Sequence, residues 1–400
     1  MHNDYYVSIM NKLFNNTEVA FALKNNKELK RARFLFKMIS KPSLVKIGSS
    51  LANFAIKTHL PVTGLIRSTV FDHFCGGVSE NDCLHVVDKM YSQGGVSSVL
   101  DYSVEGKETE KQFDAALNMT LKTIELAKER PDAIPFAVFK PTGFGRFVMF
   151  EKKGENKLLS SEEEAEWERI LYRFNVACKF AYDNDVLLLI DAEHSWMQDA
   201  ADDIVLDMMR KYNKEKAVIF NTAQMYRWDR LQYLKDLHSI AISENFYIGM
   251  KVVRGAYMEI ERERASQKGY KSPICIDKKA TDINYDAAIT FMIENIETMA
   301  LFAGTHNENS SYLVMELMKK HNISHNDKRL FFGQLYGMSD NISFNLAKEK
   351  YNVAKYLPFG PVRDVIPYLI RRAEENTSVK GQTNRELDLI ETEIKRRKAK

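Results

Sequence analysis

The segment that decides the fold is YNVAKYLPFGPVRDVIPYLIRRAEEN, residues 351–376. Its first part predicts a short strand over Asn352–Leu357. Pro358, Gly360 and Pro361 then predict a turn. A helix follows, which Pro361 can begin because the first helical turn does not need its missing N–H. The segment therefore predicts one strand–turn–helix unit.

One face of this helix combines apolar residues with a cation, since the spacing i, i+3, i+4 and i+7 places them together: Val365, Tyr368, Leu369 and Arg372. The guanidiniums of Arg371 and Arg372 offer forked donors that match a carboxylate. Tyr368 lies one turn before Arg372 and could cover the same ligand. Alternatively, both arginines are solvated or pair with Glu374 and Glu375. Spacing alone does not decide between these readings.

The same strand-then-helix rhythm recurs upstream. Eight short apolar runs predict strands: Val96–Tyr102, Pro135–Lys140, Val186–Asp191, Ala217–Thr222, Phe246–Val253, Met299–Thr305, Arg329–Leu335 and Asn352–Leu357. Continuous apolar runs are typical of parallel strands buried on both faces. Eight such units predict an α/β fold, a closed (β/α)₈ TIM barrel. A doubly wound open sheet is the alternative, and the absence of a GxGxxG loop after any strand argues against it.

The domain organisation predicted from these patterns has three parts. Residues 1–85 read as an N-terminal helical arm, 86–377 as the barrel and 378–400 as a charged helical tail on the surface. Within the arm, Leu29–Ile39 and Leu44–Leu60 show helical spacing.

Composition describes a globular protein with ample material for a core. The chain has 400 residues, 45% apolar and 28% charged, with a net charge of +3, which predicts no nucleic-acid partner. Its cysteines show neither CxxC nor zinc spacing, which favours a reduced compartment: Cys75, Cys83, Cys178 and Cys275. No signal peptide and no run of 18 apolar residues is present, so a cytoplasmic location is expected.

Polar side chains stand where nearly every predicted strand ends, the place where barrels collect functional residues. These are Asp101, Lys140, Asp191, Glu193, Gln224, Lys251, Arg254, Tyr257, Thr305, His306, Asn307, Gln334, Leu335, Tyr336 and Tyr356. Asp191 ends the most apolar strand, so we expect it to be partly buried and paired with Lys140. A barrel lysine can also form a Schiff base, which leaves an aldolase open.

Two further segments suit an anionic ligand. KVVRGAY carries two cations, Lys251 and Arg254, before Gly255–Ala256, which allow a ligand close to the backbone. The alternative is an ion pair with Glu259 or Glu261. THN, residues 305–307, precedes a predicted helix N-terminus, where phosphate or hydroxyl groups bind well. No His, Asp or Glu spacing predicts a metal site.

In order along the chain, KPTGFG, IDAE, NTAQMY, KVVRGAY, THN, FGQLYGMSD and YLPFGPVRDVIPYLIRRAEEN resemble the proline dehydrogenase (proline oxidase) family. The resemblance runs from about residue 13 to 377. Segments Asn15–Phe21 and Cys75–Gly77 resemble its monofunctional branch. The resemblance implies a distorted (β/α)₈ barrel that holds non-covalent FAD at the carboxyl ends of its strands.

The resemblance also implies roles for individual residues. Those that would bind the proline carboxylate or enclose its ring are Lys140, Tyr257, Leu335, Tyr356, Tyr368, Arg371 and Arg372. Those that would contact FAD are Glu193, Gln224, Lys251, Arg254, Gly255, Ala256, Thr305, His306, Asn307 and Glu375. Asp191 would pair with Lys140 and, with Lys251 beside flavin N5, carry the catalytic roles. Many bacterial members have Arg at the position of Lys251, so the geometry of that contact differs here.

The activity implied is oxidation of L-proline to 1-pyrroline-5-carboxylate, with FAD reduced and then reoxidised by a quinone. A membrane quinone would require peripheral membrane contact, for which the basic helices near Lys27–Lys37 are candidates. A separate 1-pyrroline-5-carboxylate dehydrogenase would act downstream. The alternatives are a hydroxyproline dehydrogenase, the Lys140 aldolase and a non-catalytic binding barrel. Tyr356 argues against the first, because relatives that prefer hydroxyproline have a smaller residue at this position.

Overall fold

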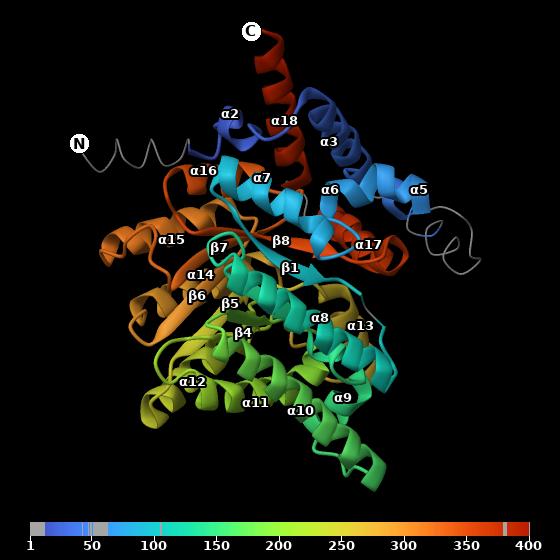
Figure 1. Ribbon diagram of the computed structural model, residues 1–400, viewed down its shortest axis with the longest axis vertical. Helices are drawn as coiled ribbons and strands as arrows, with labels where there is room; N and C mark the ends of the chain where they lie inside the picture. The colour runs from blue at the N-terminus through green and yellow to red at the C-terminus, as the bar shows by residue number, and fades with distance from the viewer. Residues whose placement is uncertain are drawn as a thin grey trace. The chain divides into compact units, whose positions relative to one another are not determined.

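The computed structural model describes residues 13–41, 43–46, 48, 50, 63–104, 106–378 and 382–399 (Figure 1). The predicted helix over Leu44–Leu60 lies for the most part outside the described residues. The predicted helix over Leu29–Ile39 is present as part of α3 (Asn26–Ile39). It begins at a capping box, in which the Asn25 side chain accepts from the backbone of Glu28 and the Glu28 carboxylate accepts from the backbone of Asn25.

Eight strands close into a barrel in sequence order, β1 to β8, which confirms the predicted fold and excludes the open sheet. The strands are β1 (Ser97–Tyr102), β2 (Phe136–Phe139), β3 (Leu187–Ile190), β4 (Ile219–Gln224), β5 (Ile248–Val253), β6 (Met299–Gly304), β7 (Leu330–Leu335) and β8 (Val353–Phe359). Neighbouring strands pair in parallel, as between β5 and β6 from Ile248↔Met299 to Val252↔Ala303.

Helices connect the strands and precede the barrel. They are α2 (Thr17–Ala20), α3, α5 (Thr63–Ile66), α6 (Asp72–Phe74), α7 (Leu84–Gly94), α8 (Glu110–Glu129), α9 (Phe147–Gly154), α10 (Ser161–Asp183), α11 (Ser195–Tyr212), α12 (Arg230–Glu244), α13 (Met258–Lys268), α14 (Lys278–Glu294), α15 (Glu308–Lys320), α16 (Asp340–Lys348), α17 (Val362–Ser378) and α18 (Gln382–Lys398). Sequence periodicity did not indicate the short helices α9 and α13. Each follows a strand end that carries predicted site residues.

Aromatic side chains fill the barrel interior. The ring of Phe136 on β2 lies 5.5 Å from that of Phe220 on β4 and 5.2 Å from that of Phe302 on β6. Strands β2, β4 and β6 are not neighbours, so rings that meet must point inward. Such a layer of side chains from alternate strands is the expected packing of this fold. All three rings are buried, which makes the barrel a packed core rather than a pore.

The end of β8 differs from the prediction. Pro358 does not turn the chain, because β8 continues through it to Phe359, and Pro358 lies opposite Asp101 of β1. Proline lacks only the N–H, and its carbonyl still accepts from the N–H of Gly76 at 2.9 Å. The turn follows at Gly360, where φ is +144°, and Pro361 stands just before α17. Pro361 thus begins the helix as predicted, because its carbonyl accepts from the N–H groups of Asp364 and Val365 in the first turn, at 2.8 and 3.2 Å.

The described residues form two compact units. The first contains residues from 1–105, 306–312 and 333–400, and the second those from 106–305 and 313–332. The first unit has its own apolar core, whose members come from the N-terminal segment, the loop after β7, α17 and α18: Ala20, Phe21, Leu29, Ala32, Phe36, Ile39, Phe71, Phe74, Cys75, Met338, Val365, Tyr368, Leu369, Leu389 and Ile390. The N-terminal helices thus share a core with the helix that carries Arg371 and Arg372.

The charged tail is a helix, as predicted, but one of its faces is buried. Figure 1 shows α18 (red) beside α3 (dark blue), and Arg33 of α3 pairs with Glu391 of α18 at 3.0 Å. Leu389 and Ile390 are at most 4% exposed, and burial of one such side chain contributes about 1.5–3 kcal/mol. Its buried face also includes Glu386 and Glu393. The sequence did not predict this buried face, because these two carboxylates occupy core-facing positions.

Candidate functional site

In the second unit, three charged residues meet at the carboxyl ends of three strands. Asp191 directly follows β3, and its Oδ1 accepts a hydrogen bond from the Lys251 ammonium of β5. Its Oδ2 lies 3.8 Å from Nζ of Lys140, which directly follows β2. The predicted pair of Lys140 and Asp191 is therefore present, and Asp191 is partly buried as expected. Sequence reasoning missed that Lys251 contacts the same carboxylate.

Gln224, the last residue of β4, holds a buried polar atom without a partner. The residue is 3% exposed, and its side-chain oxygen has no hydrogen-bond partner among the described residues. A buried acceptor without a donor costs about 1–3 kcal/mol. Such an atom is suited to accept a hydrogen bond from a ligand.

Arg254 is held within the second unit by three contacts. Its Nε donates to Asp282 at 2.7 Å and its Nη1 to the Thr305 hydroxyl at 2.9 Å. Its guanidinium lies 4.3 Å from the ring centroid of Tyr285. In the first of these contacts its partner is Asp282 rather than Glu259 or Glu261. Arg254 and Thr305, both predicted to contact FAD, are thus direct neighbours.

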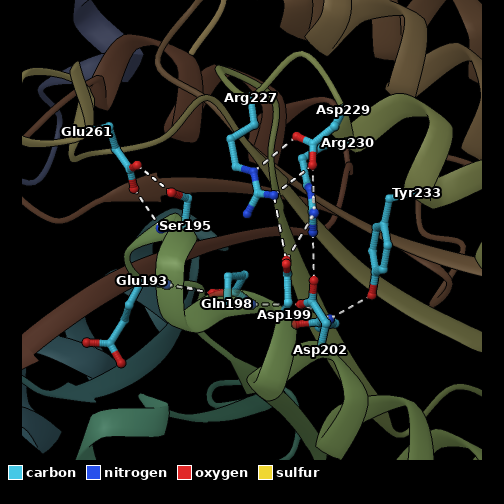
Figure 2. Close-up of polar contacts among 11 residues, drawn as sticks. Glu193, Ser195, Gln198, Asp199, Asp202, Arg227, Asp229, Arg230, Tyr233 and Glu261 are labelled. Atoms are coloured by element: carbon cyan, nitrogen blue, oxygen red, sulfur yellow. Dashed lines mark hydrogen bonds and ion pairs between the residues drawn. The ribbon is translucent and has the colours of Figure 1, made fainter. Parts of the chain in front are cut away.

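Glu261 instead holds the start of α11. The fully buried Glu261 accepts from the backbone N–H and the hydroxyl of Ser195, at 2.6 and 2.5 Å (Figure 2). Burial raises the pKa of Glu261 above its usual value, although both hydrogen bonds oppose this shift. A carboxylate at a helix N-terminus also interacts favourably with the helix dipole. Glu261 therefore fixes the chain just after Asp191 and Glu193.

Gly255 is explained by a neighbour in the chain rather than by a ligand. Its φ is +123°, and a Cβ there would lie 2.6 Å from ring atoms of Tyr226. Tyr226 therefore occupies the side on which a Cβ would lie, and the prediction that a ligand approaches the backbone of this glycine stays a prediction for its other side. Next to it, Ala256 and Tyr257 are half-buried, and the Tyr257 ring lies 4.3 Å from that of His194.

Glu193 is tied to α11 through its backbone and to the β2 end through its side chain. Its N–H donates to Gln198 Oε1 at 2.9 Å, and Gln198 Nε2 donates to Asp202 at 2.7 Å. Figure 2 shows the Glu193 carboxylate pointing away from Gln198. That carboxylate accepts from the N–H and hydroxyl of Thr142, at 3.0 and 2.8 Å.

The same network continues into the loop after β4, as Figure 2 shows. Asp202 accepts from Arg230 Nη1 at 2.6 Å and from Asn221 at 2.9 Å. Arg227 and Arg230 both donate to Asp229, at 2.7 and 2.9 Å. Although burial opposes it, these hydrogen bonds lower the pKa of Asp229 to about 2. The network joins the loops after β3 and β4, which carry Glu193 and Gln224.

In the first unit, β8 and α17 carry four of the predicted substrate-binding residues, Tyr356, Tyr368, Arg371 and Arg372. Tyr356 on β8 and Tyr368 on α17 are 7% and 5% exposed, and the Arg372 guanidinium lies 5.5 Å from the Tyr368 ring centroid. The predicted helical face is correct in that Tyr368 and Arg372 do lie together. Arg371 and Arg372 are both half-buried. The side chain of Glu375 lies outside what the structure describes.

The loop from Leu335 at the end of β7 to Asp340 contacts the THN segment. His306 Nδ1 lies 2.8 Å from the Ser339 hydroxyl, and the N–H of half-buried Leu335 donates to His306 Nε2 at 3.5 Å. Asn307 caps α15, because its side-chain oxygen accepts from the N–H groups of Asn309 and Ser310, at 2.9 and 3.3 Å. Asn307 thus satisfies N–H groups that were predicted to be available to a ligand.

A buried ionic cluster in the first unit escaped the sequence analysis. Asp340 pairs with Lys24 and, at 2.9 Å, with Lys355 of β8. Glu386 of α18 accepts from the Ser339 N–H. Burial and the neighbouring Asp340 raise the pKa of Glu386 to about 7. A lysine inside an apolar strand was the available signal, because Lys355 interrupts the run that forms β8.

The first unit also contains a cavity of about 630 Å³ with polar and apolar lining residues. Its lining includes Lys24, Arg31, His73, Tyr336 and Asp340. Cations and carboxylates alternate around it, as in the pair of Arg31 and Asp72 at 3.8 Å. The lining therefore does not select a ligand of one charge.

Among the residues that the structure describes, no three His, Cys, Asp or Glu side chains are grouped to hold a metal ion. All four cysteines are free and buried, as the sequence predicts. Within the same described ranges, no helix is both long and apolar enough to cross a bilayer.

A parallel (β/α)₈ barrel with lysines and carboxylates at its strand ends has the layout of a barrel enzyme. The family profile described as proline dehydrogenase matches residues 83–385. The chain belongs to the proline dehydrogenase family.

Several curated proteins are similar to the chain. The carbapenem antibiotics biosynthesis protein CarD of Pectobacterium carotovorum subsp. carotovorum is 38% identical over 76% of this chain and 79% of its own length. The mitochondrial proline dehydrogenase 1 of Dictyostelium discoideum is 30% identical over 97% of this chain and 75% of its own length. The hydroxyproline dehydrogenase of Xenopus laevis is 30% identical over 94% of this chain and 88% of its own length.

Among solved structures, proline utilization A (PutA) from Bdellovibrio bacteriovorus inactivated by N-propargylglycine has a TM-score of 0.70 at 20% identity. The similarity covers 90% of this chain and 38% of that chain, so the chain spans well under half the length of that protein. At this identity the likeness concerns the fold.

Proposed function

We propose that the chain oxidises L-proline to 1-pyrroline-5-carboxylate with non-covalently bound FAD and passes the electrons to a quinone. The observation that carries the proposal is the cluster of Lys140, Asp191 and Lys251 at the ends of β2, β3 and β5, in a chain that the family profile matches. One carboxylate between two ammonium groups leaves this cluster with a net positive charge, which suits an anionic substrate beside an electron-accepting cofactor.

The substrate's acid group would be bound by Arg371, Arg372 and Lys140, since guanidiniums match a carboxylate with two parallel donors. In this proposal Asp191 is a positioning residue for both lysines, because each of its oxygens faces one ammonium. The Tyr368 ring beside Arg372 restricts the directions in which this guanidinium can point.

The proline ring would be enclosed by Tyr257, Leu335, Tyr356 and Tyr368. Removal of a hydride from the carbon next to nitrogen requires the nitrogen lone pair, so the amine must be neutral. Apolar and aromatic walls disfavour the ammonium form, because they exclude the water that would stabilise its charge. These walls therefore assist the reaction as well as binding.

FAD, when bound, supplies the acceptor for the hydride. The residues present fit such a group. The unpartnered, buried oxygen of Gln224 can accept from the ring N–H of a flavin. Arg254 and Thr305 offer a cation and a hydroxyl, and Lys251 a buried ammonium that stabilises negative charge on a reduced flavin. Glu193, Gly255, Ala256, His306, Asn307 and Glu375 complete the proposed FAD-binding set.

We further propose a cytoplasmic enzyme that contacts the membrane peripherally to reach its quinone and leaves its product to a separate dehydrogenase. Helix α3 buries its apolar face in the first unit's core through Leu29, Ala32 and Phe36. Any contact of this helix with an anionic lipid surface would therefore use its lysines and arginines rather than apolar insertion.

The test is spectroscopic. Purified protein should be yellow, and anaerobic addition of L-proline should bleach the flavin absorbance, with return of the colour on addition of a soluble quinone. N-propargylglycine, the compound that inactivated the PutA of the solved structure, should also inactivate this protein. A colourless protein that takes up no FAD, or a flavin that proline does not reduce, would refute the proposal.

Hydroxyproline oxidation is the second candidate, favoured by the Xenopus laevis relative. The bulk of buried Tyr356 argues for proline, because a smaller residue would make room for the 4-hydroxyl. The ratio of kcat/KM for the two imino acids decides between them, and Tyr356→Ser should shift it toward hydroxyproline. The aldolase alternative is disfavoured, because a lysine paired with a carboxylate lacks the free electron pair that a Schiff base needs.

A further inference from the structure

The loop Leu335–Asp340 is held from one side by a buried lysine. Lys355 of β8 is fully buried and donates to the carbonyl of Met338 at 2.6 Å and to that of Leu335 at 3.4 Å. It also pairs with Asp340 at 2.9 Å, and Asp340 pairs with Lys24. The carbonyl groups of Leu335 and Met338 therefore face the buried ammonium group of Lys355.

The loop has a strained backbone that needs such support. Gly337 has a φ of +81°, and a Cβ there would lie 2.4 Å from the backbone oxygen of His73. Ser339 has a φ of +51°, in the left-handed region that residues with a Cβ seldom adopt. A residue in that region persists only where its surroundings fix it.

Helix α18 supplies the matching contact on the other side. Glu386 is 4% exposed, and its Oε1 accepts a hydrogen bond from the Ser339 N–H. Lys355 thus fixes carbonyl groups of the loop, and Glu386 fixes one of its N–H groups. The two groups come from different elements, β8 and α18, so the loop conformation depends on how the C-terminal helix packs.

Ser339 passes this restraint to His306. Its hydroxyl lies 2.8 Å from His306 Nδ1, while the Leu335 N–H donates to His306 Nε2 at 3.5 Å. Because Nε2 accepts, the proton of the neutral ring must lie on Nδ1, which then donates to the hydroxyl. The orientation and the tautomer of His306 are therefore both set by this loop.

We propose that Glu386 is a positioning residue for the cofactor site, acting through Ser339 on His306 and on the backbone of Leu335. This inference rests on the proposed function, in which His306 contacts FAD and Leu335 covers the substrate. It assigns the C-terminal helix a part in binding FAD and proline, although that helix carries no residue of the predicted site.

The test compares three full-length variants. Glu386→Ala removes the acceptor, Glu386→Gln keeps an oxygen for the Ser339 N–H, and Asp388→Asn removes an exposed charge from the same helix as a control. We expect Glu386→Ala to weaken FAD binding about tenfold and to raise KM for proline more than it lowers kcat, since it removes the acceptor that fixes the Ser339 N–H. Glu386→Gln should restore most of the affinity, and Asp388→Asn should resemble the wild type.

Ser339→Ala keeps the inference testable if Glu386→Ala does not fold. This variant retains the N–H that Glu386 accepts and loses the hydroxyl that faces His306, so FAD affinity should fall with little change in thermal stability. The tautomer of His306 gives a second readout that needs no flavin. In FAD-free protein, the ring-nitrogen NMR signals of His306, assigned by their loss in His306→Gln, should change in both Ser339→Ala and Glu386→Ala.

The outcomes separate this inference from the proposed function. If wild-type protein neither binds FAD nor oxidises proline, the proposed function fails, and the NMR measurement still tests the coupling. If wild-type protein is active but Glu386→Ala and Ser339→Ala keep its FAD affinity, KM and His306 signals, the positioning role is wrong. Equal losses in Glu386→Gln and Glu386→Ala would also overturn it, because the lost contact would then not be the hydrogen bond.

Discussion

Replacement of Asp202 tests whether the network between the loops after β3 and β4 is stabilising. Asp202 is 6% exposed and accepts three hydrogen bonds, from Arg230 at 2.6 Å, Gln198 at 2.7 Å and Asn221 at 2.9 Å. All three partners are donors at these contacts. Asp202→Asn keeps the shape of the side chain but offers one oxygen where the carboxylate offered two.

The expected loss follows from counting these donors. If the new amide oxygen faces Arg230, the new NH₂ group faces two donors, and each buried group left unsatisfied costs about 1–3 kcal/mol. Arg230 is itself 6% exposed and loses a charged partner, although Asp229 remains at 2.9 Å. Breaking a buried ion pair typically costs about 3–5 kcal/mol, and we expect a loss of this size in the free energy of unfolding.

Asp199 provides the matched control on the same helix. It lies 3.6 Å from Arg230 and 3.7 Å from Arg227, but its side chain is 64% exposed. An exposed pair contributes about 0–1 kcal/mol, so Asp199→Asn should be nearly neutral.

Urea unfolding followed by circular dichroism measures both variants, with unchanged slopes required for the comparison. Since Gln198 also loses its acceptor, FAD affinity should fall in Asp202→Asn alone, through the N–H of Glu193. A difference below about 1 kcal/mol between the two variants would refute the reasoning, because the burial of Asp202 would then carry no energetic weight.

Three further predictions concern the first unit. The pKa of Glu386 is raised to about 7 in the folded protein, so its contribution to stability is present at low pH and is lost as pH rises from about 4.5 through 7. The free energy of unfolding of Glu386→Gln, measured by urea titration, should therefore rise by about 1–3 kcal/mol relative to that of the wild type between pH 5 and 8. A difference between the two proteins that does not change with pH would contradict the raised pKa of Glu386. Gly337→Ala should cost about 3 kcal/mol or more, since its Cβ would meet the His73 carbonyl, whereas Gly269→Ala, with a φ of +71° and open space, should cost about 1 kcal/mol by the same assay. Arg372→Lys should raise KM for proline about tenfold or more with FAD still bound, as measured by steady-state kinetics and flavin absorbance, and an unchanged KM would show that Arg372 does not bind the carboxylate.

The barrel could be predicted because its strands are continuous apolar runs. Each predicted strand overlaps an observed one, since burial on both faces leaves a signal that needs no tertiary context. Pro358 shows the limit of such local rules. Proline was expected to end β8, but it is accommodated because its carbonyl still accepts a hydrogen bond from Gly76.

The C-terminal helix could not be recognised as buried from its sequence. Its buried positions follow helical spacing, but three of these five residues are polar: Thr383, Glu386, Leu389, Ile390 and Glu393. Hydropathy patterns count polar residues as surface residues, whereas Glu393 is buried because Arg396 and Arg397 donate to it, both at 2.7 Å. A polar core position is visible only when its partner is known, and the partners of Glu386 lie in other segments of the chain.

The site was predicted more completely for pairs of residues than for larger groups. Sequence reasoning paired Asp191 with Lys140 and placed Lys251 separately beside the flavin. In the structure both ammonium groups contact Asp191, one at each oxygen. An arginine at position 251 could bind both oxygens with its fork, which would compete with Lys140 for the carboxylate. A lysine there is a single-point donor, so Asp191 can hold two cations at once. Lys140 and Lys251 therefore have to be read as one unit with the carboxylate of Asp191 between them.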